Sequence, residues 1–311
     1  IKALEKGEII HMEIEKQGWL ERDLVGYSLV DMYSKCGLMT MAQQVFDKLP
    51  IRNIELWNAL ITGYAESGHD ETALECVEKM QYEGVYPDSS TYASSLKVCG
   101  KIEAGITGQN IHAEIERRKL MEGDIIVGNS LLDMYVKCGL IHMAKEVLER
   151  LPIHDVISWT TLIMGYVEYE HCEEALQLFE QMRLENILPN AATFVAILKA
   201  SSNTKYVSKG KEIHSEIVRQ KLLEENAALG NMLVDFYARC GFFAIAQQIH
   251  NELPERDVVS WTALISGYSE RGYGQEALNC FQKMQEEGII ADVVTYICSL
   301  KACGSISTQM L

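Results

Sequence analysis

Residues 258–268 read VVSWTALISGY, and two closely related stretches precede them, VISWTTLIMGY at 156–166 and IELWNALITGY at 54–64. The three stretches begin 102 residues apart. Further residues recur at the same step: Tyr33, Tyr135 and Tyr237; Cys36, Cys138 and Cys240; Pro50, Pro152 and Pro254. Several registers that share one period identify an internal repeat, so the fold must be understood as an array.

Each 102-residue period divides into repeats of 35, 36 and 31 residues. We predict one array over residues 1–311 with these boundaries: a partial repeat 1–22, then 23–53, 54–88, 89–124, 125–155, 156–190, 191–226, 227–257 and 258–292, and a partial repeat 293–311. Because the last repeat is incomplete, we expect the chain to be a fragment of a longer protein.

The pattern inside a repeat is that of a helix pair. Trp57, Leu60, Ile61 and Tyr64 follow steps of three and four residues, which is typical of an amphipathic helix. The twentieth residue of each repeat that contains one is Ala or Gly, which lets the two helices approach closely. A single pair cannot bury its apolar face, whereas stacked pairs can. The sequence therefore predicts an all-α solenoid whose first helices line a concave face.

Composition limits the possible functions. The chain is 48% hydrophobic, which suits a continuous core, but its net charge of −16 argues by itself against nucleic-acid binding. Many acidic residues fall on the predicted second helices, where we expect them to face outward: Glu71, Glu75, Glu78, Glu173, Glu174 and Glu180. The concave face is then expected to be less acidic than the surface as a whole.

Nine cysteines, without any Cys-x-x-Cys, predict free thiols in a reducing compartment and no metal site. No apolar run reaches the roughly 18 residues of a membrane span, so no membrane is expected as a partner. We find no nucleophile–base set and no phosphate loop, and therefore expect no catalysis and no cofactor within these residues.

The repeats resemble a known family. Residues 258–268 resemble the start of a pentatricopeptide repeat, and residues 132–139, LDMYVKCG, resemble the short S motif of the plant PLS subclass. Lengths of 35, 36 and 31 residues are similar to the P, L and S motifs of that subclass. The resemblance implies a right-handed α-solenoid superhelix of helix-turn-helix repeats. It also implies RNA binding in a plant organelle, mitochondrion or chloroplast, and mostly cytidine-to-uridine RNA editing.

In that family, each repeat contacts one RNA base through its fifth and last residues, and its second residue packs against the base. The resemblance gives these base-reading pairs: Asn58 with Asp88, Asn129 with Asp155 and Asn231 with Asp257 for U; Thr160 with Asn190 for A; Thr262 with Asp292 for G. It gives these base-packing residues: Ile126, Ile157, Ala228 and Val259. The implied single-stranded RNA site is 5′-nUnUAnUGn-3′.

Some positions depart from this scheme. The L repeats carry Ala93, Val195 and Ile297 as fifth residues, which cannot hydrogen-bond a base. Tyr27 with Asn53 is not a usual pair in the family, and Glu55 takes the place of an apolar second residue. We therefore assign no base to these L repeats or to residues 23–53.

Two groups of basic residues recur in the first helices. Lys97, Lys199 and Lys301 lie four residues after the fifth residue of their L repeats, on the same helix face, and are our candidates for phosphate contacts. Lys35, Lys137 and Arg239 each follow an Asp by four residues, which predicts ion pairs within the helix instead.

Two motifs match enzymes but fit the repeat better. His112-Ala113-Glu114 matches the His-x-Glu of zinc deaminases, yet no Cys-x-x-Cys follows, and His11 and His214 occupy equivalent helix positions. Residues 272–277 match a dinucleotide fingerprint, but they correspond to a turn between two helices with no strand before it. Any deaminase would lie outside this chain.

Other functions stay open. A peptide-binding scaffold of the tetratricopeptide type has 34-residue repeats, three of which also span about 102 residues. The unequal repeat lengths and the polar pairs argue against it. A pentatricopeptide factor for RNA splicing or RNA stability would share every feature described so far. The sequence leaves open the target transcript, editing-complex proteins as partners, and the oligomeric state.

Overall fold

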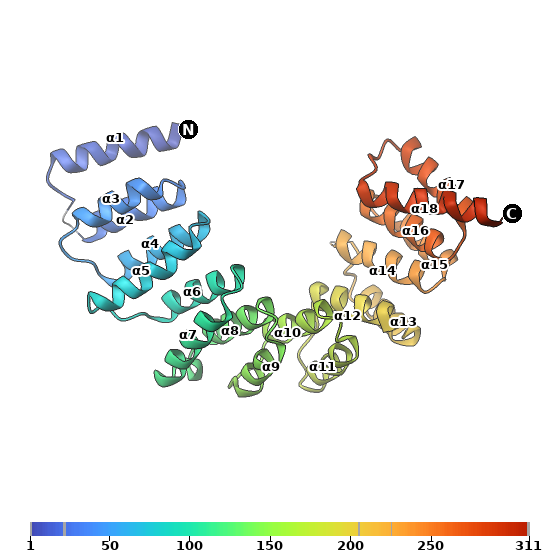
Figure 1. The fold of residues 1–311 in the computed structure, drawn as a ribbon, viewed down its shortest axis with the longest axis horizontal. Coiled ribbons are helices and arrows are strands. Elements are labelled where there is room, and N and C mark those ends of the chain that lie inside the picture. Colours follow the sequence, from blue (N-terminus) through green and yellow to red (C-terminus); the bar gives the residue numbers. More distant parts are fainter. Residues whose placement is uncertain (1, 21–22, 205, 225, 310–311) are drawn as a thin grey trace. The chain divides into compact units, whose positions relative to one another are not determined.

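The computed structural model describes residues 2–20, 23–204, 206–224 and 226–309 (Figure 1). Residues 1, 21–22, 205, 225 and 310–311, which belong to the predicted repeats 1–22, 191–226 and 293–311, lie outside the described residues. The described residues form helices and turns without any strand. Packing divides the chain into an N-terminal half, Ile1–His154, and a C-terminal half, Asp155–Leu311.

The N-terminal half contains α1 (Lys2–Lys16), α2 (Asp23–Lys35), α3 (Met39–Lys48), α4 (Ile54–Glu66), α5 (Asp70–Tyr82), α6 (Ser89–Lys101), α7 (Gly105–Arg117), a 3-10 turn η1 (Leu120–Glu122), α8 (Ile125–Lys137) and α9 (Ile141–Arg150). The C-terminal half contains α10 (Val156–Glu168), α11 (Cys172–Leu184), α12 (Ala191–Thr204), α13 (Val207–Arg219), α14 (Ala227–Arg239), α15 (Phe243–Glu252), α16 (Val258–Glu270), α17 (Gly274–Glu286) and α18 (Val293–Gln309).

Both halves are stacks of helical hairpins. In the N-terminal half, α4 packs on α5 and α6 packs on α7, while α2, α4, α6 and α8 pack in succession as one layer of first helices. In the C-terminal half, α10, α12, α14, α16 and α18 form the corresponding layer. Figure 1 shows the hairpins following one another along the chain within each half. The predicted all-α fold of helix-turn-helix repeats is confirmed.

The apolar stripes predicted from spacing form the core. Leu60 and Ile61 of α4 are fully buried, and Trp57 is 2% exposed. Met80 from α5 is also fully buried against this cluster. Complete burial of a side chain of this size contributes roughly 1.5–3 kcal/mol, so the stripe holds each hairpin together and joins it to its neighbours.

The small twentieth residues sit where helices approach most closely. A Cβ atom added at Gly210 in α13 would lie 1.9 Å from Cζ of Phe236 in α14. A Cβ atom at the equivalent Gly108 in α7 would lie 2.4 Å from Sδ of Met134 in α8. The two positions differ mainly in the stiffness of the neighbour, because a phenyl ring cannot bend whereas a methionine side chain can.

We expect Gly210→Ala to destabilise the chain by about 1–3 kcal/mol, since the fully buried Phe236 ring must shift. Gly108→Ala should cost clearly less, because Met134 can adopt another rotamer and alanine favours a helix by roughly 1 kcal/mol over glycine. Thermal unfolding of the two variants, followed by circular dichroism, measures the difference. Equal midpoints would show that neighbour stiffness does not limit this contact.

Candidate nucleic-acid interface

The second residues of several repeats expose apolar side chains at the start of the first helices. Ile126, Ile157 and Val259 are 62%, 56% and 55% exposed, and Ala228 is exposed as well. Other aliphatic side chains are at least as exposed, such as Leu184 and Ile290, so these positions stand out by the recurrence of the exposure at the second residue of the repeat. A planar apolar partner such as a nucleobase would cover them. The charged Glu55 is exposed at the same position of α4.

The fifth residue of α4 is held by the last residue of its repeat. Nδ2 of Asn58 donates to Oδ1 and Oδ2 of Asp88 at 3.1 and 3.3 Å. The Asp88 carboxylate also accepts the backbone N–H of Thr91 at 2.9 Å and caps α6. Burial alone would raise the pKa of Asp88, but the hydrogen bonds from Thr91 and Asn58 outweigh it and lower the pKa. The carboxylate is therefore charged at neutral pH.

The same arrangement recurs in the C-terminal half. Nδ2 of Asn231 donates to Oδ1 and Oδ2 of Asp257 at 3.1 and 2.9 Å. Asp257 caps α16 by accepting the backbone N–H of Ser260 at 2.9 Å. Burial would raise the pKa of Asp257, yet the hydrogen bonds from Ser260 and Asn231 lower it overall. The predicted U pairs at these two places are thus direct side-chain contacts in the folded chain.

In the two pairs whose fifth residue is threonine, the hydroxyl of a third residue connects the fifth residue to the last residue. Oγ1 of Thr160 lies 2.7 Å from Oγ1 of Thr193, which donates to Oδ1 of Asn190 at 3.0 Å. Thr262 likewise lies 2.6 Å from Thr295 Oγ1, which donates to Oδ1 of Asp292 at 2.7 Å. This hydrogen bond from Thr295 is the main cause that lowers the pKa of Asp292.

Asn129 and Asp155 belong to different halves of the chain. Asn129 lies on α8 and is half-buried. Asp155 caps α10, where its carboxylate accepts the backbone N–H of Ser158 at 2.7 Å. Asp155 therefore has the same capping role as Asp88 and Asp257.

The fifth residues are less open than the sequence suggested. Thr160 and Asn231 are only 6% and 8% exposed, because each is hydrogen-bonded across the repeat boundary. The third residue of each L repeat is a threonine that was not singled out from the sequence: Thr91, Thr193 and Thr295. Their spacing of 102 residues, three places after an Asp or Asn, is a capping-box pattern that could have revealed them.

A hollow of about 360 Å³ opens beside Asn58. Its walls come from α2, α4 and the start of α6, and they include the fifth residue of the preceding repeat, Tyr27. The second residues Glu55 and Ser90 line it as well. The hollow therefore lies beside the base-reading residue and is lined by the second residues of two adjacent repeats.

The two groups of basic residues behave differently. Lys97, Lys199 and Lys301 are exposed on first helices, and no ion pair involves them within the part of the chain that the structure describes. In contrast, the i and i+4 ion pairs predicted for the other group are present: Lys35 with Asp31 at 2.7 Å, Lys137 with Asp133 at 2.7 Å, and Arg239 with Asp235 at 2.8 Å. The two groups therefore differ in whether an acidic side chain of the same helix holds them.

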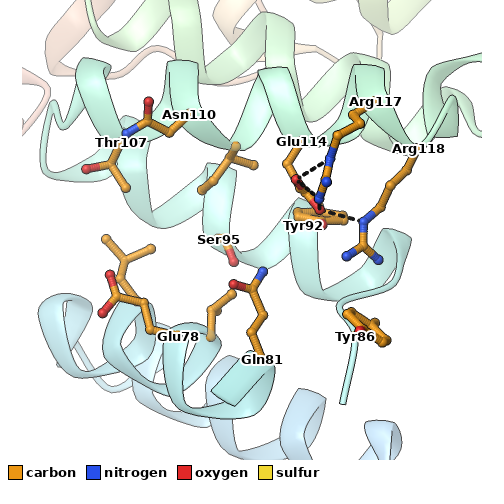
Figure 2. Close-up of a pocket in the computed structure, with 13 residues that line it drawn as sticks. Glu78, Gln81, Tyr86, Tyr92, Ser95, Thr107, Asn110, Glu114, Arg117 and Arg118 are labelled. Atoms are coloured by element: carbon orange, nitrogen blue, oxygen red, sulfur yellow. Dashed lines mark hydrogen bonds and ion pairs between the residues drawn. The ribbon is translucent and has the colours of Figure 1, made fainter. Parts of the chain in front are cut away.

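A second hollow of about 400 Å³ lies between α5, α6 and α7 (Figure 2). No predicted base-reading residue lines it. In the next copy of the repeat, Arg183 and Glu212 form an ion pair at 2.6 Å. The equivalent residues are Gln81 and Asn110, both of which line the hollow. A hollow of about 430 Å³, lined in part by Glu212, occurs in that copy as well, so the ion pair does not decide whether the hollow forms.

The motifs that match enzymes have packing roles. Nδ1 of His112 lies 2.8 Å from the hydroxyl of Tyr135, and the equivalent histidines His11 and His214 make the same contact with Tyr33 and Tyr237. Residues 272–273 connect α16 and α17. Among the described residues, no cluster of His, Cys, Asp and Glu could hold a metal ion. No helix in the described ranges is long and apolar enough to cross a membrane.

Comparison with known proteins places these repeats in a family. The model of the PPR repeat family matches residues 52–101, 154–203 and 256–305, and that of the PPR repeat matches residues 27–54 and 129–155. Together the two models cover more than half of the chain. The structure is also similar to a crystal structure of the pentatricopeptide repeat protein PPR10 in complex with an 18-nt psaJ RNA element, with a TM-score of 0.77 and 18% identity. That likeness covers 95% of this chain and 44% of PPR10.

Two curated relatives come from Arabidopsis thaliana. A pentatricopeptide repeat-containing protein named as mitochondrial is 37% identical over 96% of this chain and 54% of its own length. Another, named as chloroplastic, is 34% identical over 98% of this chain and 49% of its own length. The chain spans about half the length of these relatives. The matched repeats, the helical hairpins and the shared fold establish that this chain belongs to the pentatricopeptide repeat family.

Proposed function

We propose that this chain binds single-stranded RNA in a plant organelle and reads one base with each P repeat and with the S repeats 125–155 and 227–257. The observation that carries the proposal is the recurring contact between the fifth and last residues, as in Asn58 with Asp88 and Asn231 with Asp257. These polar groups lie in repeats whose second residues are exposed, and most of those second residues are apolar. Stacking and edge recognition are the two contacts that an unpaired base requires.

Charge distribution supports this function despite the net charge of −16. The glutamates of the second helices α5 and α11, such as Glu71 and Glu173, are exposed there. Lys97 and Lys199 are exposed on first helices and are not held in ion pairs with other described residues. We therefore assign Lys97, Lys199 and Lys301 to phosphate contacts. With so few cations, binding should depend only modestly on salt.

The fuller assignment is the recognition part of a cytidine-to-uridine editing factor of the PLS subclass. Repeat lengths of 35, 36 and 31 residues support the subclass. Solved PPR10 is named as an RNA complex, and the curated relatives are named as mitochondrial or chloroplastic, which supports RNA and an organelle here. Editing-complex proteins would be further partners, and the deaminase would lie outside these residues. Factors for RNA splicing or stability would use the same binding step.

The implied RNA, 5′-nUnUAnUGn-3′, should bind more tightly than a variant in which the A and the G exchange places. The exchange keeps the base composition but reverses the hydrogen-bond donors and acceptors at two positions. Each mismatched position weakens the binding free energy by roughly 1–3 kcal/mol. We expect at least about a tenfold loss of affinity, measured by fluorescence anisotropy with each n held constant. Equal affinity would reject the base assignment, and no binding of either RNA would favour a peptide-binding scaffold.

Replacement of Asp292 by asparagine should shift the base read by the last complete repeat from G to A. The asparagine oxygen can still cap α18 through Thr295, while its amide nitrogen donates where the carboxylate accepted. We expect the ratio of affinities for G and A at this position to fall by about tenfold. The preference for A at the position read by Thr160 serves as an internal control and should stay unchanged. If the variant kept the wild-type ratio of affinities for G and A at the position read by Thr262 as well as at the control position, the assignment of Asp292 to base reading would be wrong.

A further inference from the structure

We propose that Thr193, the third residue of the following repeat, determines base specificity by fixing which atoms of Thr160 and Asn190 face the RNA. The proposal rests on the RNA-binding function proposed above. Thr193 is fully buried, so it acts as a positioning residue without touching the RNA. Thr295 has the same place beside Thr262 and Asp292.

The hydroxyl of Thr193 has no spare hydrogen-bonding capacity. Its proton goes to Oδ1 of Asn190 at 3.0 Å, and it accepts the backbone N–H of Asn190 at 3.2 Å. A hydroxyl has one donor and two acceptor sites, so we assign the Thr160 hydroxyl as the donor of the remaining contact with Thr193, at 2.7 Å. The proton of Thr160 is thereby directed away from the RNA, and its oxygen can only accept.

The orientation of Asn190 is fixed by the same residue. Its Oδ1 accepts both the backbone N–H of Thr193, at 2.9 Å, and the hydroxyl of Thr193. Both lone pairs of this oxygen are occupied, which leaves the amide nitrogen to face outward as a donor. Asn190 is exposed, so this donor can reach a ligand.

The pair then presents an acceptor at Thr160 and a donor at Asn190. Adenine offers the complementary groups, an amino donor at N6 and an acceptor at N1. In the same orientation, guanine places its O6 acceptor against the acceptor at Thr160 and its N1 donor against the donor at Asn190. Neither contact can then form a hydrogen bond. The threonine relay thus excludes guanine by leaving it two unsatisfied contacts, which is the costly case for buried polar groups.

In the equivalent set of Thr262, Asp292 and Thr295, only the last residue of the repeat differs, because an aspartate replaces the asparagine. Thr295 gives its proton and its backbone N–H to Oδ1 of Asp292, at 2.7 and 2.8 Å. The other carboxylate oxygen and Thr262 then form two acceptors. The outer carboxylate oxygen suits the N1 donor of guanine where the amide nitrogen of Asn190 suits the N1 acceptor of adenine, so the last residue decides between the two bases.

A natural contrast exists where a P repeat follows an S repeat. The hydroxyl of Ser260 bonds the backbone of Asp257, donating to its carbonyl at 3.0 Å, and does not contact Asn231. Oδ1 of Asn231 accordingly has no hydrogen-bond partner among the residues that the structure describes. At the P-to-L boundary, by contrast, the hydroxyl of Thr91 lies within hydrogen-bonding distance of Oδ1 of both Asn58 and Asp88. The threonine, not the cap alone, connects the following repeat to the fifth residue.

Thr193→Val tests the proposal because valine keeps the shape but removes the hydroxyl. We expect the ratio of affinities for A and G at this position to fall by at least about fivefold, since Thr160 becomes free to donate. Replacement of the adenine by purine, which lacks the amino group, should weaken binding to the wild type but have little effect on the valine variant. If Thr193 only stabilised the helix, its replacement would not change the effect of removing the adenine amino group.

Two variants separate the relay from helix capping. Thr193→Ser should keep the wild-type ratio, and Ser260→Ala, which removes a capping hydroxyl without a relay, should leave the preference at the Asn231 position unchanged. A valine variant that is helical and keeps the full ratio would overturn the proposal, as would an equal loss from Ser260→Ala. If the wild type itself does not distinguish A from G, the proposed function fails instead.

Discussion

The carboxylate at the end of repeats 54–88 and 227–257 has two roles at one place. It accepts the backbone N–H that opens the next first helix, as Asp257 does for Ser260, and the same side chain holds the fifth residue, Asn231. A helix cap of this kind contributes about 1 kcal/mol, so the side chain is fixed before any ligand arrives. The groups proposed to read a base are therefore positioned by the interaction that starts the neighbouring helix.

This constraint lowers the cost of recognition. A polar side chain that is free in solution loses rotamer entropy when it binds, whereas Asn58 and Asn231 are already held by hydrogen bonds. Their partial burial limits how many of their groups a ligand can reach, and this restriction is a source of discrimination between bases. In the proposed complex with RNA, the exposed apolar second residues, such as Ile157 and Val259, supply contact area that does not depend on the base.

Much of the fold could be predicted from the sequence, because helical periodicity and the 102-residue step are local regularities. The hairpins and the buried Trp57 stripe followed directly, whereas the close contact predicted within a pair at Gly210 lies against Phe236 of the next repeat. The ion pair of Lys137 with Asp133 followed as well, since both residues lie on one helix. The structure brings together the members of the pairs Asn58 with Asp88 and Asn231 with Asp257, and their base-reading role stays a prediction.

The role of Thr193 could not be seen in the same way. Its hydrogen bonds join residues 33 positions apart in two helices of different repeats, and their directions depend on which protons are already used. Sequence spacing identifies a capping threonine but does not say that its hydroxyl also reaches Thr160. The low exposure of Thr160 has the same origin, because it depends on how closely α10 and α12 pack.

A crystal structure of the chain bound to 5′-nUnUAnUGn-3′ tests the central claim most directly. The account predicts that the adenine edge lies within hydrogen-bonding distance of Oγ1 of Thr160 and Nδ2 of Asn190, with Thr193 still bonded to both residues. It also predicts that Ile157 packs against the face of the base. An RNA bound along the second helices, or one whose bases turn away from Thr160 and Asn190, would contradict the account.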